Sequence, residues 1–153
     1  MKAIHYVVVC ILIGLFFFAS YDEFQEYSSN GQRVSSYEHG IISRVYIENQ
    51  KMIQVVETDG YNKGLNFVVT IEKGRIVDFE IISHQETEDY AGYITEEWFK
   101  ERLLVSCVES LKVVKLSKEN ENEIVAVTGA TITTDSIVNG VNNCIENYWR
   151  YLK

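Results

Sequence analysis

Residues 67–82 (FVVTIEKGRIVDFEII) form two apolar runs separated by Lys73 and Gly74. In both runs apolar residues alternate with others, the pattern of a strand with one face on a core and the other toward solvent. Lys73-Gly74 is placed where a tight turn would join the two runs. We therefore predict an antiparallel hairpin whose core-facing residues are Phe67, Val69, Ile71, Val77, Phe79 and Ile81.

The segments next to this hairpin predict more of the sheet and a first helix. Residues 52–57 (MIQVVE) indicate another strand, and residues 59–64 indicate a loop rich in glycine and asparagine. After a polar loop, a helix is expected from about Thr95. Phe99 and Leu103 are four residues apart and would share one face of it, with Trp98 beside them.

The C-terminal part of the chain predicts a short strand at residues 124–127, after a charged surface loop, and then a long helix. Thr134 or Asp135 is suited to cap the helix. Its apolar residues recur at helical spacing: Ile137, Val138, Val141, Ile145, Tyr148, Trp149 and Leu152. The fold class predicted is α+β, a small antiparallel sheet with packed helices in one domain over residues 50–153.

The N-terminal residues 3–21 are uncharged and largely apolar. As a helix they would be about 28 Å long, close to the ~30 Å hydrocarbon core of a bilayer. Lys2 in front of them favours an N-terminus inside and the remaining chain outside a bacterial cytoplasmic membrane. A retained transmembrane anchor over residues 1–21 is favoured over a cleaved signal peptide, because no small-x-small cleavage site follows. Residues 22–49 are then a polar connector.

The charge of the chain narrows the classes of partner. The net charge is −8, and no cluster of lysine and arginine interrupts the acidity, so a nucleic-acid partner is disfavoured. Cys107 and Cys144 would lie in a compartment where a disulfide can form, and both the paired and the free states stay open. The spacing of His39 and His84 relative to these cysteines does not predict a metal site.

Residues 128–135 (TGATITTD) join the last strand to the last helix and carry the clearest chemical signal. Gly129 and Ala130 allow a bulky group to approach the backbone, and the helix that follows offers free N–H groups and a positive dipole end. These features suit an anionic phosphate. The segment is neither a P-loop nor a dinucleotide-binding turn. The alternative is a plain strand-to-helix junction with a capping threonine.

Residues 128–134 closely resemble the flavinylation motif of the FMN-binding domain, in which Ser or Thr is followed by Gly-Ala-Thr, any residue, Thr, and Ser or Thr. This domain occurs in the C subunit of the sodium-pumping NADH:quinone reductase and in the G subunit of the Rnf complex. Residues 84–87 (HQET) resemble a second family motif, and residues 59–64 (DGYNKG) resemble a third with one extra residue. Where many members continue with Pro-Gly, this chain has Glu88 and Asp89, two acids that would disfavour reduced, anionic flavin.

The resemblance implies that FMN is attached to Thr131 through a phosphoester, installed by a separate flavin transferase that uses FAD and Mg²⁺. Glu86 and Thr87 would approach the flavin or serve only as solvated loop residues. Two weaker candidates are His84, as a proton partner or a surface residue, and Tyr61, as a packing contact. The residues expected around the phosphate are Thr128, Gly129, Ala130, Thr133 and Thr134, of which Thr134 is equally suited to be only the helix cap.

The function that follows from the resemblance is an extracytoplasmic, membrane-tethered electron carrier. It would take electrons from a membrane donor and pass them to an unidentified acceptor, as a free shuttle or as a subunit of a membrane oxidoreductase. The flavin would supply the chemistry, and no catalytic or metal-binding residue is predicted. An exported binding module of the same fold without flavin is the alternative, and a small flavin-dependent reductase is a third class.

Overall fold

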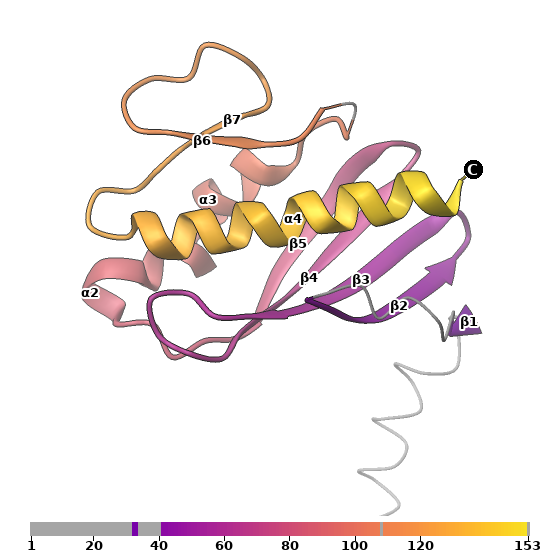
Figure 1. Cartoon of the computed structure of the whole chain (residues 1–153), viewed down its shortest axis with the longest axis horizontal. Coiled ribbons are helices and arrows are strands. Elements are labelled where there is room, and N and C mark those ends of the chain that lie inside the picture. Colours follow the sequence, from indigo (N-terminus) through magenta and orange to yellow (C-terminus); the bar gives the residue numbers. More distant parts are fainter. Residues whose placement is uncertain (1–31, 34–40, 108, 153) are drawn as a thin grey trace, which may run out of the picture. The chain divides into compact units, whose positions relative to one another are not determined.

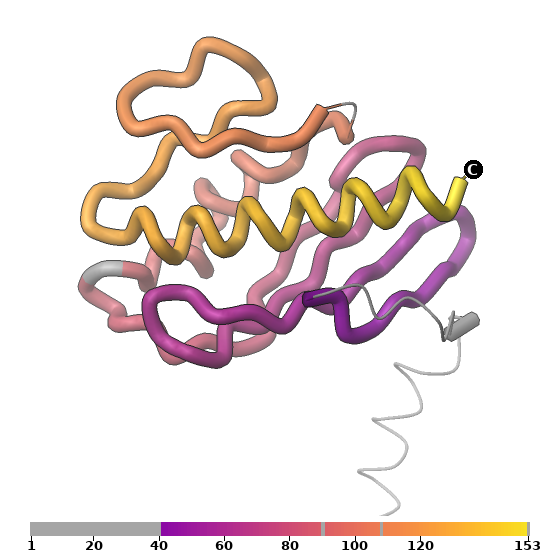
Figure 2. Tube along the Cα trace, in the orientation of Figure 1, coloured from indigo at the N-terminus to yellow at the C-terminus, as the bar shows by residue number. Residues whose placement is uncertain are grey.

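The computed structural model of the chain describes residues 32–33, 41–107 and 109–152. Figures 1 and 2 show an α+β arrangement, as predicted. The elements are, in chain order, β1 (Gln32–Arg33), β2 (Ile42–Glu48), β3 (Lys51–Thr58), β4 (Leu65–Glu72), β5 (Arg75–Ser83), α2 (Glu88–Ala91), the 3-10 helix η1 (Gly92–Thr95), α3 (Glu97–Leu103), β6 (Lys112–Val114), β7 (Glu123–Val125) and α4 (Thr131–Tyr151).

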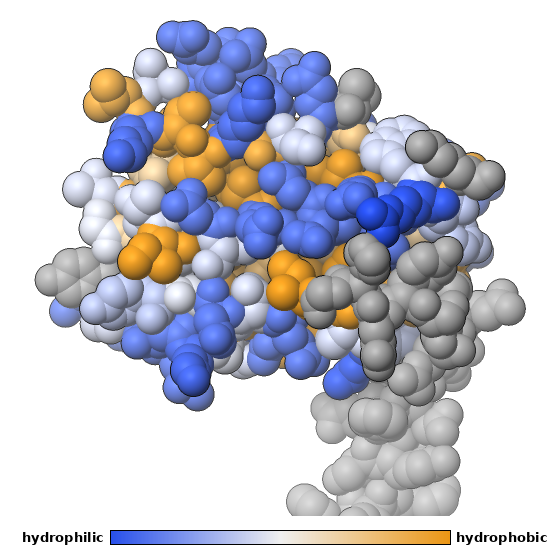
Figure 3. All heavy atoms as spheres, viewed as in Figure 1, coloured by the Kyte–Doolittle hydropathy of each residue, from blue (hydrophilic) through white to orange (hydrophobic). Residues whose placement is uncertain are grey.

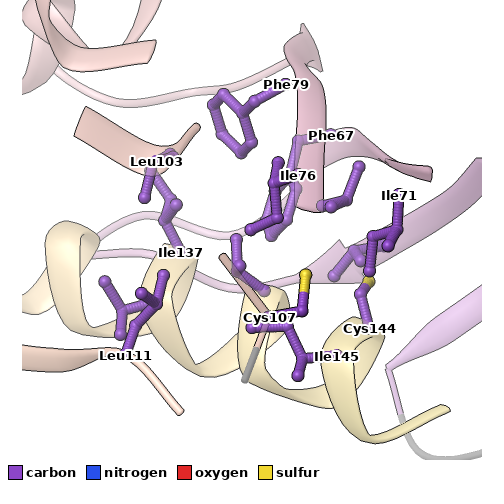
Figure 4. Packing of buried hydrophobic residues seen from close by; sticks show 14 of the residues in the cluster. Phe67, Ile71, Ile76, Phe79, Leu103, Cys107, Leu111, Ile137, Cys144 and Ile145 are labelled. Atoms are coloured by element: carbon purple, nitrogen blue, oxygen red, sulfur yellow. The ribbon is translucent and has the colours of Figure 1, made fainter. Parts of the chain in front are cut away.

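Strands β2 to β5 pair in sequence order, each antiparallel to the next. Helix α4 crosses one face of this sheet (Figure 1), and side chains from the sheet, α3 and α4 meet in one buried cluster (Figure 4). Gly140 lets α4 approach closely, since a Cβ built there would lie 2.5 Å from Cζ of Phe67 and 3.1 Å from Cγ1 of Val56. In Figure 3 the outward surface of α4 is mostly hydrophilic.

A buried amide pair fixes how α4 is placed on the sheet. Gln54 of β3 is fully buried, and its Nε2 donates to the carbonyl of Cys144 at 2.9 Å. Its Oε1 accepts from Nδ2 of Asn147 at 2.8 Å. Since an unpaired buried amide is costly, sliding α4 along the sheet would leave these groups unsatisfied.

The predicted hairpin is confirmed as β4 and β5, with Lys73 (φ 50°) and Gly74 (φ 75°) in the turn. The prediction that Val77 faces the core is wrong. A register shift lets Ile71 pair with Ile76 and Thr70 with Asp78, so one residue of β5 is extra. Ile76 is therefore 1% exposed and Val77 is 41% exposed.

The far face of β4 also differs from the expectation, because Val68 and Thr70 are each only 8% exposed. Strand β4 lies between β3 and β5 in the sheet. Neighbouring strands flank it on both sides, which covers short side chains even on the face away from α4.

The expected connector over residues 22–49 is corrected in its last part, where Ile42–Glu48 forms strand β2. This strand pairs with β3 from Ile42 opposite Val56 to Glu48 opposite Lys51. The segment alternates weakly in sequence, and cross-strand pairing with the predicted strand makes it regular. The domain thus includes residues before 50.

The other predicted elements of the domain are confirmed. Phe99 and Leu103 of α3 are fully buried, and Trp98 is 40% exposed. The predicted strand at residues 124–127 is β7, which pairs in parallel with β6 and follows the charged loop. The predicted final helix is α4, although it begins three residues before Thr134.

The predicted transmembrane helix over residues 1–21 lies outside the described residues, as do residues 22–31 and 34–40 of the predicted connector. Among the residues that the structure describes, no helix is long and apolar enough to cross a bilayer.

Cys107 and Cys144 are free thiols with no exposed surface, in the cluster shown in Figure 4. Burial raises the pKa of the Cys107 thiol from 9.0 to about 11. Burial, and then the nearby Cys107, raise the pKa of Cys144 as well.

We expect the free energy of unfolding to fall as the pH rises above 9. The unfolded chain then loses thiol protons that the folded chain keeps, which costs up to about 1.4 kcal/mol per pH unit for each thiol. Urea unfolding between pH 8 and 10, under reducing conditions, would measure this slope. In Cys107→Ala/Cys144→Ala the absolute stability should be lower and the slope flatter. An identical slope in both proteins would show that Cys107 and Cys144 do not cause the pH dependence of the unfolding free energy.

Candidate functional site

The N-terminus of α4, helix α2 and the loop between β3 and β4 gather at one end of the domain (left in Figure 1). Between them lies a pocket of about 660 Å³. Its lining residues are Tyr61, Glu86, Thr87, Ala91, Gly129, Ala130, Thr131, Ile132 and Thr133. A volume of this size is typical of pockets for small molecules and cofactors.

The motif segment folds as a tight turn into α4. Gly129 adopts φ 87°, a conformation that favours glycine, and the N–H of Ala130 donates to the carbonyl of Val127 at 3.0 Å. Thr131 is the first residue of α4, and the N-cap residue Ala130 makes no side-chain capping hydrogen bond. The expected cap by Thr134 or Asp135 is therefore wrong, because the helix begins before both residues. An uncapped helix N-terminus has N–H groups available to an anion.

The four threonines of the motif have different surroundings. Thr128 is exposed but does not line the pocket, and Thr133 lines the pocket but is fully buried. Thr134 is fully buried and outside the lining. Thr131 is the one that is both exposed and part of the pocket lining.

Glu86 connects the motif to the loop between β3 and β4. Glu86 is 7% exposed, and its Oε2 accepts a hydrogen bond from the Thr133 hydroxyl at 2.9 Å. Its Oε1 accepts from the N–H of Asn62 at 3.0 Å, and the N–H of Tyr61 donates to Oγ1 of Thr133 at 3.4 Å. Hydrogen bonds to a carboxylate are among the stronger kind, so this network fixes one wall of the pocket.

Tyr93 of η1 holds the other side of the motif. Its hydroxyl lies 3.0 Å from Oγ1 of Thr134 and donates to the carbonyl of Ala130 at 3.3 Å. The Thr134 hydroxyl and N–H also donate to that carbonyl, at 3.0 and 3.1 Å. Burial raises the pKa of Tyr93, so the phenol stays protonated as a donor. Sequence reasoning missed Tyr93, because tyrosine is abundant in this chain and no motif singles it out.

The remaining candidates differ in their relation to the pocket. Thr87 is at the N-cap position of α2 and lines the pocket. Tyr61 also lines it and is 73% exposed. His84 is not among the lining residues, and its buried Nδ1 has no hydrogen-bond partner within the described part of the chain.

We expect Gly60→Ala to disturb this site. A Cβ at Gly60 would overlap Oε1 of Glu86 and lie 3.1 Å from its Cδ and 3.3 Å from Cγ2 of Thr133. The loss should be about 1–3 kcal/mol of unfolding free energy, the usual cost of forced repacking. Thermal unfolding would measure it. Gly92→Ala is the matched control, since a Cβ there meets only Cβ of Glu88 at 3.8 Å. Equal unfolding temperatures for the two variants would contradict the expectation.

The lining fits a cofactor that bears a phosphate. Hydroxyl and backbone groups of Gly129 and Thr131 lie at the helix end, and the side chains of Tyr61, Ala91 and Ile132 offer apolar surface. The fold and site thus have the features of a ligand-binding α+β domain whose helix terminus is suited to an anion.

Residues 60–146 match the family model described as the FMN-binding domain, and the chain belongs to this family. It is 33% identical over 91 residues to the G subunit of the proton-translocating ferredoxin:NAD(+) oxidoreductase complex of Clostridium ljungdahlii, covering 59% of this chain and 49% of that protein. It is 36% identical over 93 residues to the G subunit of the Na(+)-translocating ferredoxin:NAD(+) oxidoreductase complex of Acetobacterium woodii, covering 60% of this chain and 45% of that protein. The chain thus spans about half the length of each relative.

Among solved structures, the chain resembles NqrC of Shewanella oneidensis with a TM-score of 0.58. The similarity covers 77% of this chain and 68% of NqrC at 14% sequence identity, and it shows a shared fold. The predicted family resemblance is therefore confirmed by sequence and by fold.

Proposed function

We propose that this protein is an electron-transfer flavoprotein that carries FMN covalently, through a phosphoester to Thr131. When bound, the flavin supplies the redox chemistry, and the protein positions it and adjusts its potential. Attachment would join the Thr131 oxygen to the FMN phosphate of FAD, with AMP as the leaving group and the hydroxyl proton released. A flavin transferase with Mg²⁺ would catalyse this step.

The observation that carries the proposal is the position of Thr131. It is the motif threonine that is exposed in the pocket lining, and it begins a 21-residue helix whose N-cap residue makes no side-chain capping hydrogen bond. A phosphate held there would meet the positive end of the helix dipole, which is worth about 0.3–1 kcal/mol at an exposed site. The alternative use of the threonine as a cap is disfavoured, because Ala130 occupies the N-cap position.

The neighbouring residues would have separate roles. Gly129 leaves room beside the phosphate, and Tyr61 and Ile132 (55% exposed) offer apolar surface to the flavin ring. Glu86 and Thr133 would stabilise the wall of the pocket through their hydrogen bond, and Thr87 would contact the cofactor. Thr128 and Thr134 would act through the conformation of the turn.

The assignment of electron transfer is supported by the relatives, which are subunits of ferredoxin:NAD(+) oxidoreductase complexes. We propose that the apolar residues 1–21 tether the domain to the outer face of a bacterial cytoplasmic membrane. The donor would be a membrane redox protein and the acceptor another carrier. Lys2 in front of the apolar segment supports the extracytoplasmic side, because positive charge favours the inner end.

The test is to express the full chain with a flavin transferase and denature it completely. Flavin that stays with the protein, and that mass spectrometry places on Thr131, is the expected result. Flavin released by denaturation would refute covalent attachment. A protein that takes up no flavin would favour a binding module of the same fold without flavin.

We expect Glu88→Gln/Asp89→Asn to raise the reduction potential of the flavin. Both residues are exposed and begin α2, directly after pocket residue Thr87. For a separation of the order of 10 Å in water-like surroundings, each negative charge removed would favour the reduced form by about 0.4 kcal/mol. Redox titration of the flavinylated proteins would measure the shift. Glu119→Gln/Glu121→Gln, in the loop between β6 and β7, is the control. An unchanged reduction potential in Glu88→Gln/Asp89→Asn would refute the effect of these two acids on the flavin.

A further inference from the structure

We propose that residues 86–99, here called the acidic wall, form the docking surface for a redox protein with a positively charged surface. The inference rests on the proposed function, because the partner would exchange electrons with a flavin in the adjoining pocket. Glu86, Thr87 and Ala91 of the wall line that pocket directly. A partner bound here would therefore be next to the cofactor.

The charge of the wall has one sign. Residues 86–99 contain five acids and no lysine or arginine. Four of the acids, Glu88, Asp89, Glu96 and Glu97, are exposed. A surface with one sign of charge beside a binding site attracts partners of opposite charge and speeds their encounter.

Some basic residues adjoin the wall and others lie far from it: Lys100 and Arg102 follow it in α3, and Lys63 is in the loop between β3 and β4. Lys51 and Lys73 lie at the turns where β3 and β5 begin and line a second pocket near the end of α4. Thr131 and Leu152 are at opposite ends of α4, which spans about 30 Å at 1.5 Å per residue. Lys51 and Lys73 are therefore at the far end of α4 from the first pocket, beside which the four exposed acids of the wall lie.

The wall also has an exposed aromatic residue. Trp98 is 40% exposed, and its ring stacks on that of Tyr93 with centroids 5.7 Å apart. The Tyr93 hydroxyl reaches the carbonyl of Ala130 beside Thr131. The guanidinium carbon of Arg102, in the same helix, lies 4.5 Å from the centroid of the Trp98 ring.

Apolar contact with a polar, charged rim is the usual anatomy of an interface, and aromatic residues are enriched in its centre. Tyr61 and Ile132 are exposed in the pocket lining, and Trp98 is exposed in α3 directly after Glu96 and Glu97. The partner of matching chemistry is a basic redox protein with apolar surface around its own cofactor. An acidic carrier would be repelled.

The test uses the full flavinylated chain and a basic c-type cytochrome as the electron acceptor. In each productive encounter one electron passes from the reduced flavin to the ferric haem. We expect the second-order rate constant to fall steeply with ionic strength. Glu96→Gln/Glu97→Gln should lower it several-fold at about 10 mM salt, and the difference should vanish near 1 M, where the Debye length is about 3 Å.

The control is Glu119→Gln/Glu121→Gln, which removes the same charge from exposed positions of the loop between β6 and β7. Its rate constant should stay close to wild type. If the rate constant falls equally in the two variants, the attraction depends on net charge alone and the proposal is overturned. A rate constant that neither variant changes would overturn it too. Redox titration of each protein checks that the driving force is unchanged.

A binding measurement separates this proposal from the proposed function. Flavin-free Thr131→Ala, titrated with oxidised cytochrome by calorimetry, should bind more tightly than the same protein carrying the Glu96→Gln/Glu97→Gln change. Trp98→Gln should weaken binding at both low and high salt. If the wild-type chain carries no covalent flavin, the proposed function is refuted. The comparison of affinities between the two flavin-free proteins still tests the docking surface. If neither Glu96→Gln/Glu97→Gln nor Trp98→Gln changes the affinity for the cytochrome, the docking surface is refuted.

Discussion

Replacing Thr131 with alanine is expected to abolish covalent flavin, with fluorescence of the denatured protein falling to background. The alcohol oxygen is the atom that would bond to the FMN phosphate, and no other motif threonine is both exposed and in the pocket lining. Thr133 and Thr134 have their hydroxyls in hydrogen bonds within the fold, to Glu86 and to the carbonyl of Ala130. A substitute acceptor would have to leave these bonds.

Two measurements make this expectation specific. Thr131→Ser keeps the oxygen and should retain flavin, and mass spectrometry should find it on residue 131. Thr131→Ala should unfold at nearly the same temperature as the wild-type protein without flavin. Thr131 is exposed, and it is not the N-cap residue of α4. Covalent flavin on Thr131→Ala would contradict the assignment of the attachment point.

Introducing valine at Gly140 is expected to cause the largest loss of stability among these changes. The glycine lies where α4 meets β3 and β4, and a Cβ at this position would overlap the ring of Phe67. That ring is fully buried and packs on Phe79 with centroids 5.3 Å apart, so it has little room to move. Overpacking costs about 1–3 kcal/mol or more. The small gain in helix propensity offsets only about 0.5 kcal/mol of this.

Urea or thermal unfolding of Gly140→Val would measure the loss. About 2–3 kcal/mol corresponds to a fall of roughly 10 °C or more in Tm for a domain of this size. Asn139→Ala is the matched control, as it changes an exposed neighbour on the same helix turn and should be neutral or slightly stabilising. If Gly140→Val were as stable as wild type, the close approach of α4 to the sheet would be wrong.

Much of the fold was predictable because its signals are local. The hairpin of β4 and β5 follows from alternation and from Lys73-Gly74, and α4 follows from apolar residues at helical spacing. The position of Val77 was not predictable in this way. A bulge changes which side chains face the core without changing the composition of the strand.

Strand β2 also shows where local signals end. Ile42–Glu48 contains Ser43, Arg44 and Glu48 and resembles a polar connector in sequence. It is a strand because β3 supplies a neighbour for its backbone hydrogen bonds. Strand formation depends on context more than helix formation does, so a single sequence gives a weak indication here.

The candidate site likewise has features that the sequence predicts and features that only the tertiary structure sets. The residues of segment 128–135 indicated a site suited to a phosphate or a plain junction, and the resemblance to the FMN-binding domain then singled out Thr131, Glu86 and Thr87. Tertiary structure alone decided that Thr131 faces a pocket, that Thr133 is bonded to Glu86, and that Tyr93 holds the turn. These contacts join residues 37 to 47 positions apart. Spacing along the chain says nothing about such pairs, because the packing of α4, η1 and the loops brings them together.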